Sequence, residues 1–129
     1  ALLNLLNHFG SSIFSFKPSG IISYSAGQWG GTRAAHALRP TLSELGCLPV
    51  SAMVHVPKAQ AVLQPDGRTI VASEQQRWDE YAGRTLSQLQ WWAAAAKTHT
   101  EQVDPRTSSP ALTTNPAQRN APGLGGSAG

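Results

Sequence analysis

The sequence has almost no cysteine and no long apolar run. Cys47 is the only cysteine among 129 residues, which excludes an internal disulfide or a multi-cysteine zinc site and predicts a free, buried thiol in a reducing compartment. No apolar stretch approaches the ~20 residues of a membrane-spanning helix, and the first residues lack the basic region and cleavage site of a secretory signal. We therefore expect a soluble, cytoplasmic protein that does not bind a membrane.

The sequence also has no large excess of positive over negative charge. Ten Lys and Arg face seven Asp and Glu, and the basic residues are scattered singly, so we expect no nucleic-acid partner. His36 and His55 stand without a carboxylate or a second ligand at a useful spacing. We therefore expect no metal site.

The apolar spacing predicts a helix over 2–9, a strand over 20–25, a helix over 32–45, a strand over 48–56 and a helix over 74–98. This alternation is typical of an α/β fold, in which helices cover parallel strands. Nothing caps the first helix, so we expect the chain to be a fragment that begins inside a larger domain. Residues 100–129 are rich in Pro, Gly, Ser and Thr, and we expect them to form a disordered tail.

The segment most suggestive of chemistry follows the first predicted strand and runs Ser-Tyr-Ser-Ala-Gly-Gln-Trp-Gly-Gly from Ser23 to Gly31. In a parallel sheet, ligands bind beyond the carboxyl ends of the strands, and this segment occupies that position. Its glycines would leave backbone N–H groups uncovered, and the following helix N-terminus would add partial positive charge. The pattern favours binding of a planar or anionic group, although a packing role is as common for such a turn. It matches neither the P-loop nor the Gly-x-Gly-x-x-Gly motif.

A serine hydrolase is a less favoured alternative. The sequence around Ser25 is one residue away from the Gly-x-Ser-x-Gly nucleophile motif. However, four residues separate it from the predicted helix, and no suitable Asp and His follow.

The stretch from Lys17 to Gly46, with its Ser-x-Ser-x-Gly-x-x-Gly-Gly-x-Arg segment, resembles the NADPH-dependent FMN reductases, a flavodoxin-like family that includes quinone, azo and chromate reductases. The resemblance extends back to Leu2 and forward to the helix that follows the Asp66-Gly67 turn. It implies a partial flavodoxin-like three-layer fold with helix, strand, helix, strand and helix in order. Residues 1–99 would be the C-terminal part of that domain, and the parallel sheet would lack its first three strands.

The resemblance also implies a cofactor and a site. The residues beside the isoalloxazine ring of FMN would be Ser23, Tyr24, Ser25, Gly27, Gln28, Trp29, Gly30 and Gly31. NADPH or NADH would be the electron donor, and no side chain is assigned a catalytic role because the flavin carries the chemistry. The family's Gly-Ser-x-Arg phosphate loop and Pro-Glu-Tyr-Asn segment are absent from this sequence.

The resemblance therefore implies a flavin-dependent NAD(P)H oxidoreductase of the FMN or quinone reductase type, or a truncated derivative that supplies only the loop beside the isoalloxazine ring. Without the phosphate loop, we expect the chain alone to be inactive. A homo-oligomer is expected because the family fold would leave strand edges and apolar helix faces uncovered. The alternative is a non-catalytic remnant or interaction module on a flavodoxin-like scaffold, in which an exposed strand edge pairs with a partner.

Overall fold

The computed structural model describes residues 2–9 and 11–108. Its elements, in chain order, are α1 (Leu2–Phe9), α2 (Ser11–Phe14), β1 (Pro18–Ser19), β2 (Ile22–Tyr24), α3 (Thr32–Glu44), β3 (Leu48–Pro49), β4 (Val54–Val56), α4 (Ala59–Val62), a 3-10 turn η1 (Ala72–Glu74), α5 (Gln75–Gln102) and α6 (Pro105–Ser108).

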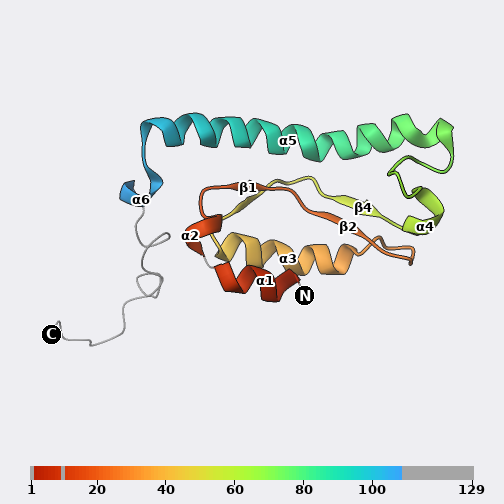
Figure 1. The fold of residues 1–129 in the computed structure, drawn as a ribbon, viewed down its shortest axis with the longest axis horizontal. Helices are drawn as coiled ribbons and strands as arrows, with labels where there is room; N and C mark the ends of the chain where they lie inside the picture. The colour runs from red at the N-terminus through yellow and green to blue at the C-terminus, as the bar shows by residue number, and fades with distance from the viewer. Residues whose placement is uncertain (1, 10, 109–129) are drawn as a thin grey trace.

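The strands form the middle of three layers (Figure 1). β1 pairs with β3 and β2 pairs with β4, and both pairs are parallel. The long helix α5 covers one face of the strands, while α1 and α3 lie on the other. The predicted α/β fold class, a partial flavodoxin-like arrangement with parallel strands, is therefore confirmed.

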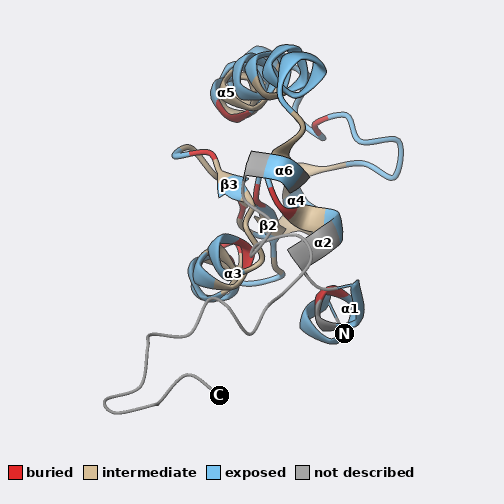
Figure 2. Cartoon of the chain, turned by 90° about the vertical axis from the view of Figure 1, so that its left-hand side faces the viewer, coloured by how far each residue is buried: buried red, intermediate tan, exposed pale blue. Residues whose placement is uncertain are grey.

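The main core lies between the strands and α3. Leu6, Ile21, Ala35 and Leu42 form its buried cluster, and Leu38 and Leu45 pack against it. The apolar stripe predicted for α3 thus faces inward, as Figure 2 shows by the buried positions on the strand-facing side of this helix.

The predicted strand over 48–56 is split into β3 and β4, and β1 lies before the predicted strand over 20–25, which contains β2. Here the prediction is wrong. Pro18 pairs with Leu48, whereas Ile22 pairs with Val54, so the second strand carries two more residues than the first between these pairs. These two extra residues leave the hydrogen-bonded ladder around Ser51 and Ala52. There the side-chain oxygen Oε1 of Gln88 accepts hydrogen bonds from Ser51 Oγ at 2.9 Å and from the Ala52 N–H at 3.1 Å.

Helix α5 packs against the chain at Gly20, between β1 and β2. A Cβ atom on Gly20 would lie 3.5 Å from the side chains of Thr85 and Leu89, and Thr85 is fully buried. Trp92, on the same helix, is exposed to 43%. The helix has no span that is long and apolar enough to cross a bilayer, nor does any other helix in the described ranges.

The boundary expected near residue 100 differs from the structure. α5 continues to Gln102 and the one-turn helix α6 follows, so residues 100–108 do not have the disorder predicted for them. No proline interrupts α5, and Pro105 stands at the first position of α6, where the missing N–H of proline costs nothing. The rest of the predicted tail, 109–129, lies outside the described residues.

Candidate functional site

The loop over residues 25–31, called here the glycine loop, connects the end of β2 to the start of α3. Parallel pairing brings the carboxyl end of β4 and the following helix α4 to the same side of the molecule (Figure 1). The backbone that follows Val56 therefore supplies the groups that fix this loop.

The first half of the glycine loop is fixed through its carbonyl groups. The Ala59 N–H donates to the carbonyl of Ser25 at 3.0 Å, and the Lys58 N–H donates to the carbonyl of Gly27 at 3.0 Å. Ser25 in turn donates its N–H to the carbonyl of Val56 at 3.1 Å. These three bonds connect the loop to the β4–α4 junction.

The second half is fixed in the same way. The Trp29 carbonyl accepts hydrogen bonds from the backbone N–H and the hydroxyl of Thr32, and the Gly30 carbonyl accepts one from Ser23 Oγ at 2.7 Å. The backbone N–H groups from Gly27 to Gly30 take part in none of the bonds that hold the loop. Most of the loop's carbonyls, although not those of Ala26 and Gln28, are thus bonded within the protein, and the N–H groups from Gly27 to Gly30 are not part of that network.

Two glycines in the loop have positions that no other residue fits. Gly30 and Gly31 have positive φ angles of 56° and 75°, which L-residues rarely adopt. A Cβ atom on Gly30 would lie 2.9 Å from the Val56 nitrogen, and one on Gly31 would lie 3.0 Å from the Tyr24 carbonyl oxygen. Gly27 differs, because a Cβ there would meet only Ser25 Oγ, at 3.9 Å.

The eight residues of the predicted site divide by position. Tyr24, Gly27, Gln28 and Trp29 are exposed, with Trp29 accessible to 71%. Ser23, Ser25 and Gly31 are half-buried, and Gly30 is buried. The structure therefore places a less accessible base of Ser23, Gly30 and Gly31 beneath an accessible tip.

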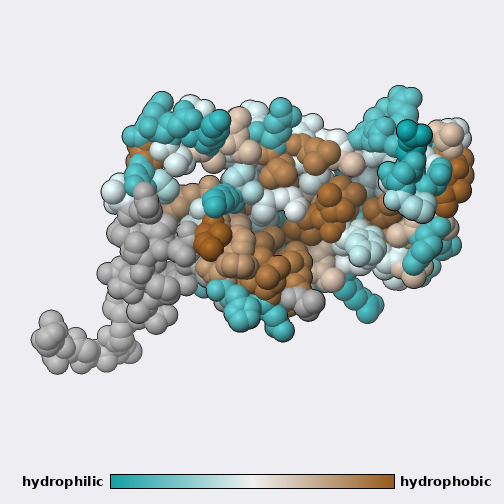
Figure 3. Space-filling model, viewed as in Figure 1, coloured by the Kyte–Doolittle hydropathy of each residue, from teal (hydrophilic) through white to brown (hydrophobic). Residues whose placement is uncertain are grey.

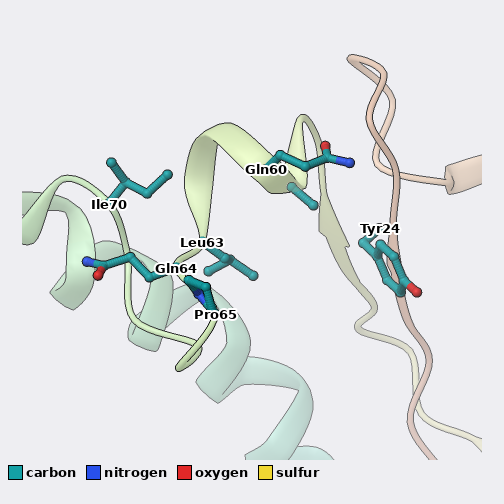
Figure 4. A pocket seen from close by; sticks show the side chains of 7 residues that line it. Tyr24, Gln60, Leu63, Gln64, Pro65 and Ile70 are labelled. Atoms are coloured by element: carbon teal, nitrogen blue, oxygen red, sulfur yellow. The ribbon is translucent and has the colours of Figure 1, made fainter.

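An open hollow of about 560 Å³ lies beside the glycine loop, between Tyr24 and α4. Its apolar lining includes Leu63, Pro65 and Ile70, and the Gln60 side chain extends across it toward β2 (Figure 4). Tyr24, accessible to 74%, forms its opposite wall. The hollow can receive a flat apolar group and offers a phenol and an amide at its rim.

A second hollow of about 470 Å³ lies at the other edge of β2. It is lined by apolar side chains of α1, β2 and α3, among them Leu2, Ile22 and Leu38. Figure 3 shows hydrophobic surface gathered over this part of the molecule. Within the described ranges, β2 has a neighbouring strand on its β4 side only.

Ser25 has no arrangement suited to nucleophilic attack. The Ser25 hydroxyl donates to the Gly27 carbonyl at 3.1 Å. The histidine on the neighbouring strand, His55, is hydrogen-bonded to Ser23 instead. In the described part of the chain, no three His, Cys, Asp or Glu side chains gather where they could hold a metal ion.

Sequence reasoning missed the residues that support the loop. His55 is the middle residue of β4, and Lys58 and Ala59 follow that strand. Only the register between β2 and β4 brings these three residues to the glycine loop. The signal available in the sequence was the rule that neighbouring parallel strands end at one edge of a sheet.

Comparison with known proteins supports the resemblance found in the sequence. The family model of the NADPH-dependent FMN reductases matches residues 1–61, just under half of the chain, and this span contains the whole glycine loop and its supports up to Ala59. Searches of curated proteins and of solved structures returned no match. Over residues 1–61, the chain is thus confirmed as similar to the NADPH-dependent FMN reductases.

Proposed function

We propose that the glycine loop binds the isoalloxazine ring of a flavin, as part of a flavin-dependent NAD(P)H oxidoreductase. The observation that carries this proposal is the division of the loop's backbone groups. The carbonyls of Ser25, Gly27, Trp29, Gly30 and Gly31 accept hydrogen bonds from the protein, whereas the N–H groups from Gly27 to Gly30 take part in none of the backbone bonds that hold the loop. The edge of an isoalloxazine ring carries carbonyl oxygens and ring nitrogens, which are acceptors of this kind.

The shape of the loop also fits the ring. Gly30 and Gly31 let the loop lie directly against the backbone of Val56 and Tyr24, and the exposed Trp29 indole can pack against an aromatic face. When bound, a flavin supplies hydride transfer, while the protein orients it and sets the electrostatic environment. The chain's own part is to hold the ring edge and to keep the loop closed toward β4.

The proposed site holds the ring side of the cofactor only. The sequence contains no Gly-Ser-x-Arg segment, which in the resembling family holds the FMN phosphate. A charge-assisted hydrogen bond to phosphate is worth about 1.5 to 3 kcal/mol, and each 1.4 kcal/mol changes affinity about tenfold. We therefore expect this chain to bind FMN weakly and to oxidise NAD(P)H negligibly by itself.

The test compares FMN with riboflavin, which has the same ring and no phosphate. With ¹⁵N-labelled protein, both flavins should shift the amide signals of Gly27 to Gly31, and their Kd values should agree within about threefold. FMN binding at least tenfold tighter than riboflavin would place a phosphate site in this chain. Signals that shift elsewhere while the loop signals stay fixed would refute the proposal.

Alanine substitutions at two glycines, Gly30 and Gly83, provide a test variant and its matched control. Gly30→Ala puts a methyl group 2.9 Å from the Val56 backbone, so the loop must open and flavin binding should fall at least tenfold. Gly83→Ala, in α5, meets nothing within 4 Å and should leave binding unchanged while it slightly favours the helix. If folded Gly30→Ala protein binds riboflavin as tightly as the parent, the loop is not the flavin site.

A further inference from the structure

Ser23 and His55 form a cross-strand pair beneath the glycine loop. They are register partners in the β2–β4 ladder, and both are half-buried. Ser23 Oγ lies 2.7 Å from His55 Nδ1 and 2.7 Å from the carbonyl oxygen of Gly30. One hydroxyl oxygen therefore connects a histidine on β4 to the turn that begins α3.

The hydrogens available on Ser23, Gly30 and His55 determine which atom donates in each of these two contacts. A serine hydroxyl has one hydrogen to donate, and a carbonyl oxygen can only accept. Ser23 therefore donates to Gly30 and must accept from His55. If His55 Nδ1 carried a lone pair instead, one of the two 2.7 Å contacts would bring two lone pairs together. The geometry requires the hydrogen of the neutral His55 ring to be on Nδ1.

The bond to Gly30 also orients the next amide group. In a trans peptide the N–H points opposite to the C=O. When the Gly30 carbonyl is held inward by Ser23, the N–H of Gly31 is directed away from Ser23. The orientation of the Gly31 amide thus depends on Ser23, whose own orientation depends on His55.

His55 is held from both layers that flank the strands. Its ring lies against the ring of His36 on α3, with ring centroids 6.5 Å apart and an interplanar angle of 25°. Its backbone N–H donates to the Tyr81 hydroxyl on α5 at 3.1 Å. These contacts restrict the ring and the backbone independently of any ligand.

We infer that His55 is a positioning residue of the glycine loop, which acts by donating the Nδ1 hydrogen to Ser23 and thereby fixing the Gly30–Gly31 peptide. Its effect on flavin affinity depends on the proposed function, whereas its effect on the tautomer and on the loop does not. The arrangement assigns a role to a histidine that no motif in the sequence includes.

The test starts with the ring of His55 in the unmodified protein. At a pH where the ring is neutral, ¹⁵N NMR should show hydrogen on Nδ1, and Ser23→Ala should allow the ring to return to the Nε2–H form that free histidine favours. A wild-type ring with an unprotonated Nδ1 would overturn the inference whatever the flavin result.

Two substitutions at His55 separate hydrogen bonding from packing. In His55→Asn the amide nitrogen occupies the position of Nδ1 and can still donate to Ser23, whereas in His55→Gln the nitrogen lies one bond further away. We expect His55→Asn to keep riboflavin affinity within about threefold of the parent, and His55→Gln and Ser23→Ala to lose about tenfold. The Gly30 and Gly31 amide signals should move in the last two variants only.

The outcomes distinguish this inference from the flavin proposal. If no flavin binds but the Gly31 amide moves in His55→Gln and stays in His55→Asn, the positioning role stands and the flavin proposal fails. If the two His55 variants have equal loop signals and equal affinities, the donor role of His55 is refuted.

Discussion

Cys47 is the one thiol of the chain, and its surroundings suppress its reactivity. It is half-buried, and Sγ contacts the carbonyl oxygen of Phe14 at 3.3 Å. Burial raises the pKa of this thiol, an effect that the positive charge of Lys17 opposes only in part. At any pH below that raised pKa, a smaller fraction is thiolate, the reactive form, than in an exposed cysteine.

We therefore expect Cys47 to react with iodoacetamide at pH 8 several-fold more slowly in the folded chain than in denaturant, with the rate rising as the pH increases. Because the sequence has no other cysteine, mass spectrometry reads the rate directly. Equal rates in the folded and denatured chains would show that the thiol is exposed.

At this scale, the sequence indicated which residues form the loop but not how each is held. Glycines after a strand predict an uncovered backbone, and Gly30 and Gly31 do adopt positive φ. The partner of Ser23 could not be predicted, because His55 reaches it only through a register that contains an irregular segment. Local pattern does not determine such a register.

Gln88 is the polar contact by which α5 holds the irregular part of the second strand. Its Oε1 atom accepts from Ser51 Oγ and from the half-buried Ala52 N–H. Gln88→Ala leaves that N–H without its partner, which should lower the free energy of unfolding by about 1 to 2 kcal/mol. Gln88→Glu keeps an acceptor oxygen and should lose less.

Chemical denaturation measures this effect, with Gln90→Ala as the control. Gln90 is exposed on the same helix, and its replacement changes helix propensity alone. If Gln88→Ala and Gln90→Ala have the same unfolding midpoint, Gln88 does not stabilise the strand.

The elements themselves were predicted with uneven success. Periodicity located α1, α3 and α5 because each has apolar residues at helical spacing. It missed β1, and it missed the break within 48–56, because the alternation there continues through Ser51 and Ala52 although the ladder does not. It also placed the end of α5 too early, because the polar composition after Thr98 does not itself stop a helix.

On the scale of the whole molecule, the open edge of β2 is the surface most suited to a second copy of the chain. Ile22 is exposed to 62% there, beside the apolar hollow between α1 and α3. An uncovered, apolar strand edge favours pairing between chains. We expect concentration-dependent dimers in sedimentation experiments, which Ile22→Lys should shift toward the monomer by placing charge on the edge.

Val71→Lys is the control for that experiment, because Val71 is also exposed, at 54%, and lies outside β2 and its hollow. It should leave the association constant unchanged. A wild-type chain that stays monomeric at every concentration, or equal effects of the two lysines, would exclude the β2 edge as the interface.

The hydrogen bonds of the glycine loop have a consequence for the order in which the protein folds. All of them join residues between Ser23 and Ala59, and α3 is the long helix within that span. The packing of α5 on Gly20 instead joins positions more than sixty residues apart, and long closures lose more chain entropy and form more slowly. We therefore expect the loop and its supports to close on themselves before α5 docks.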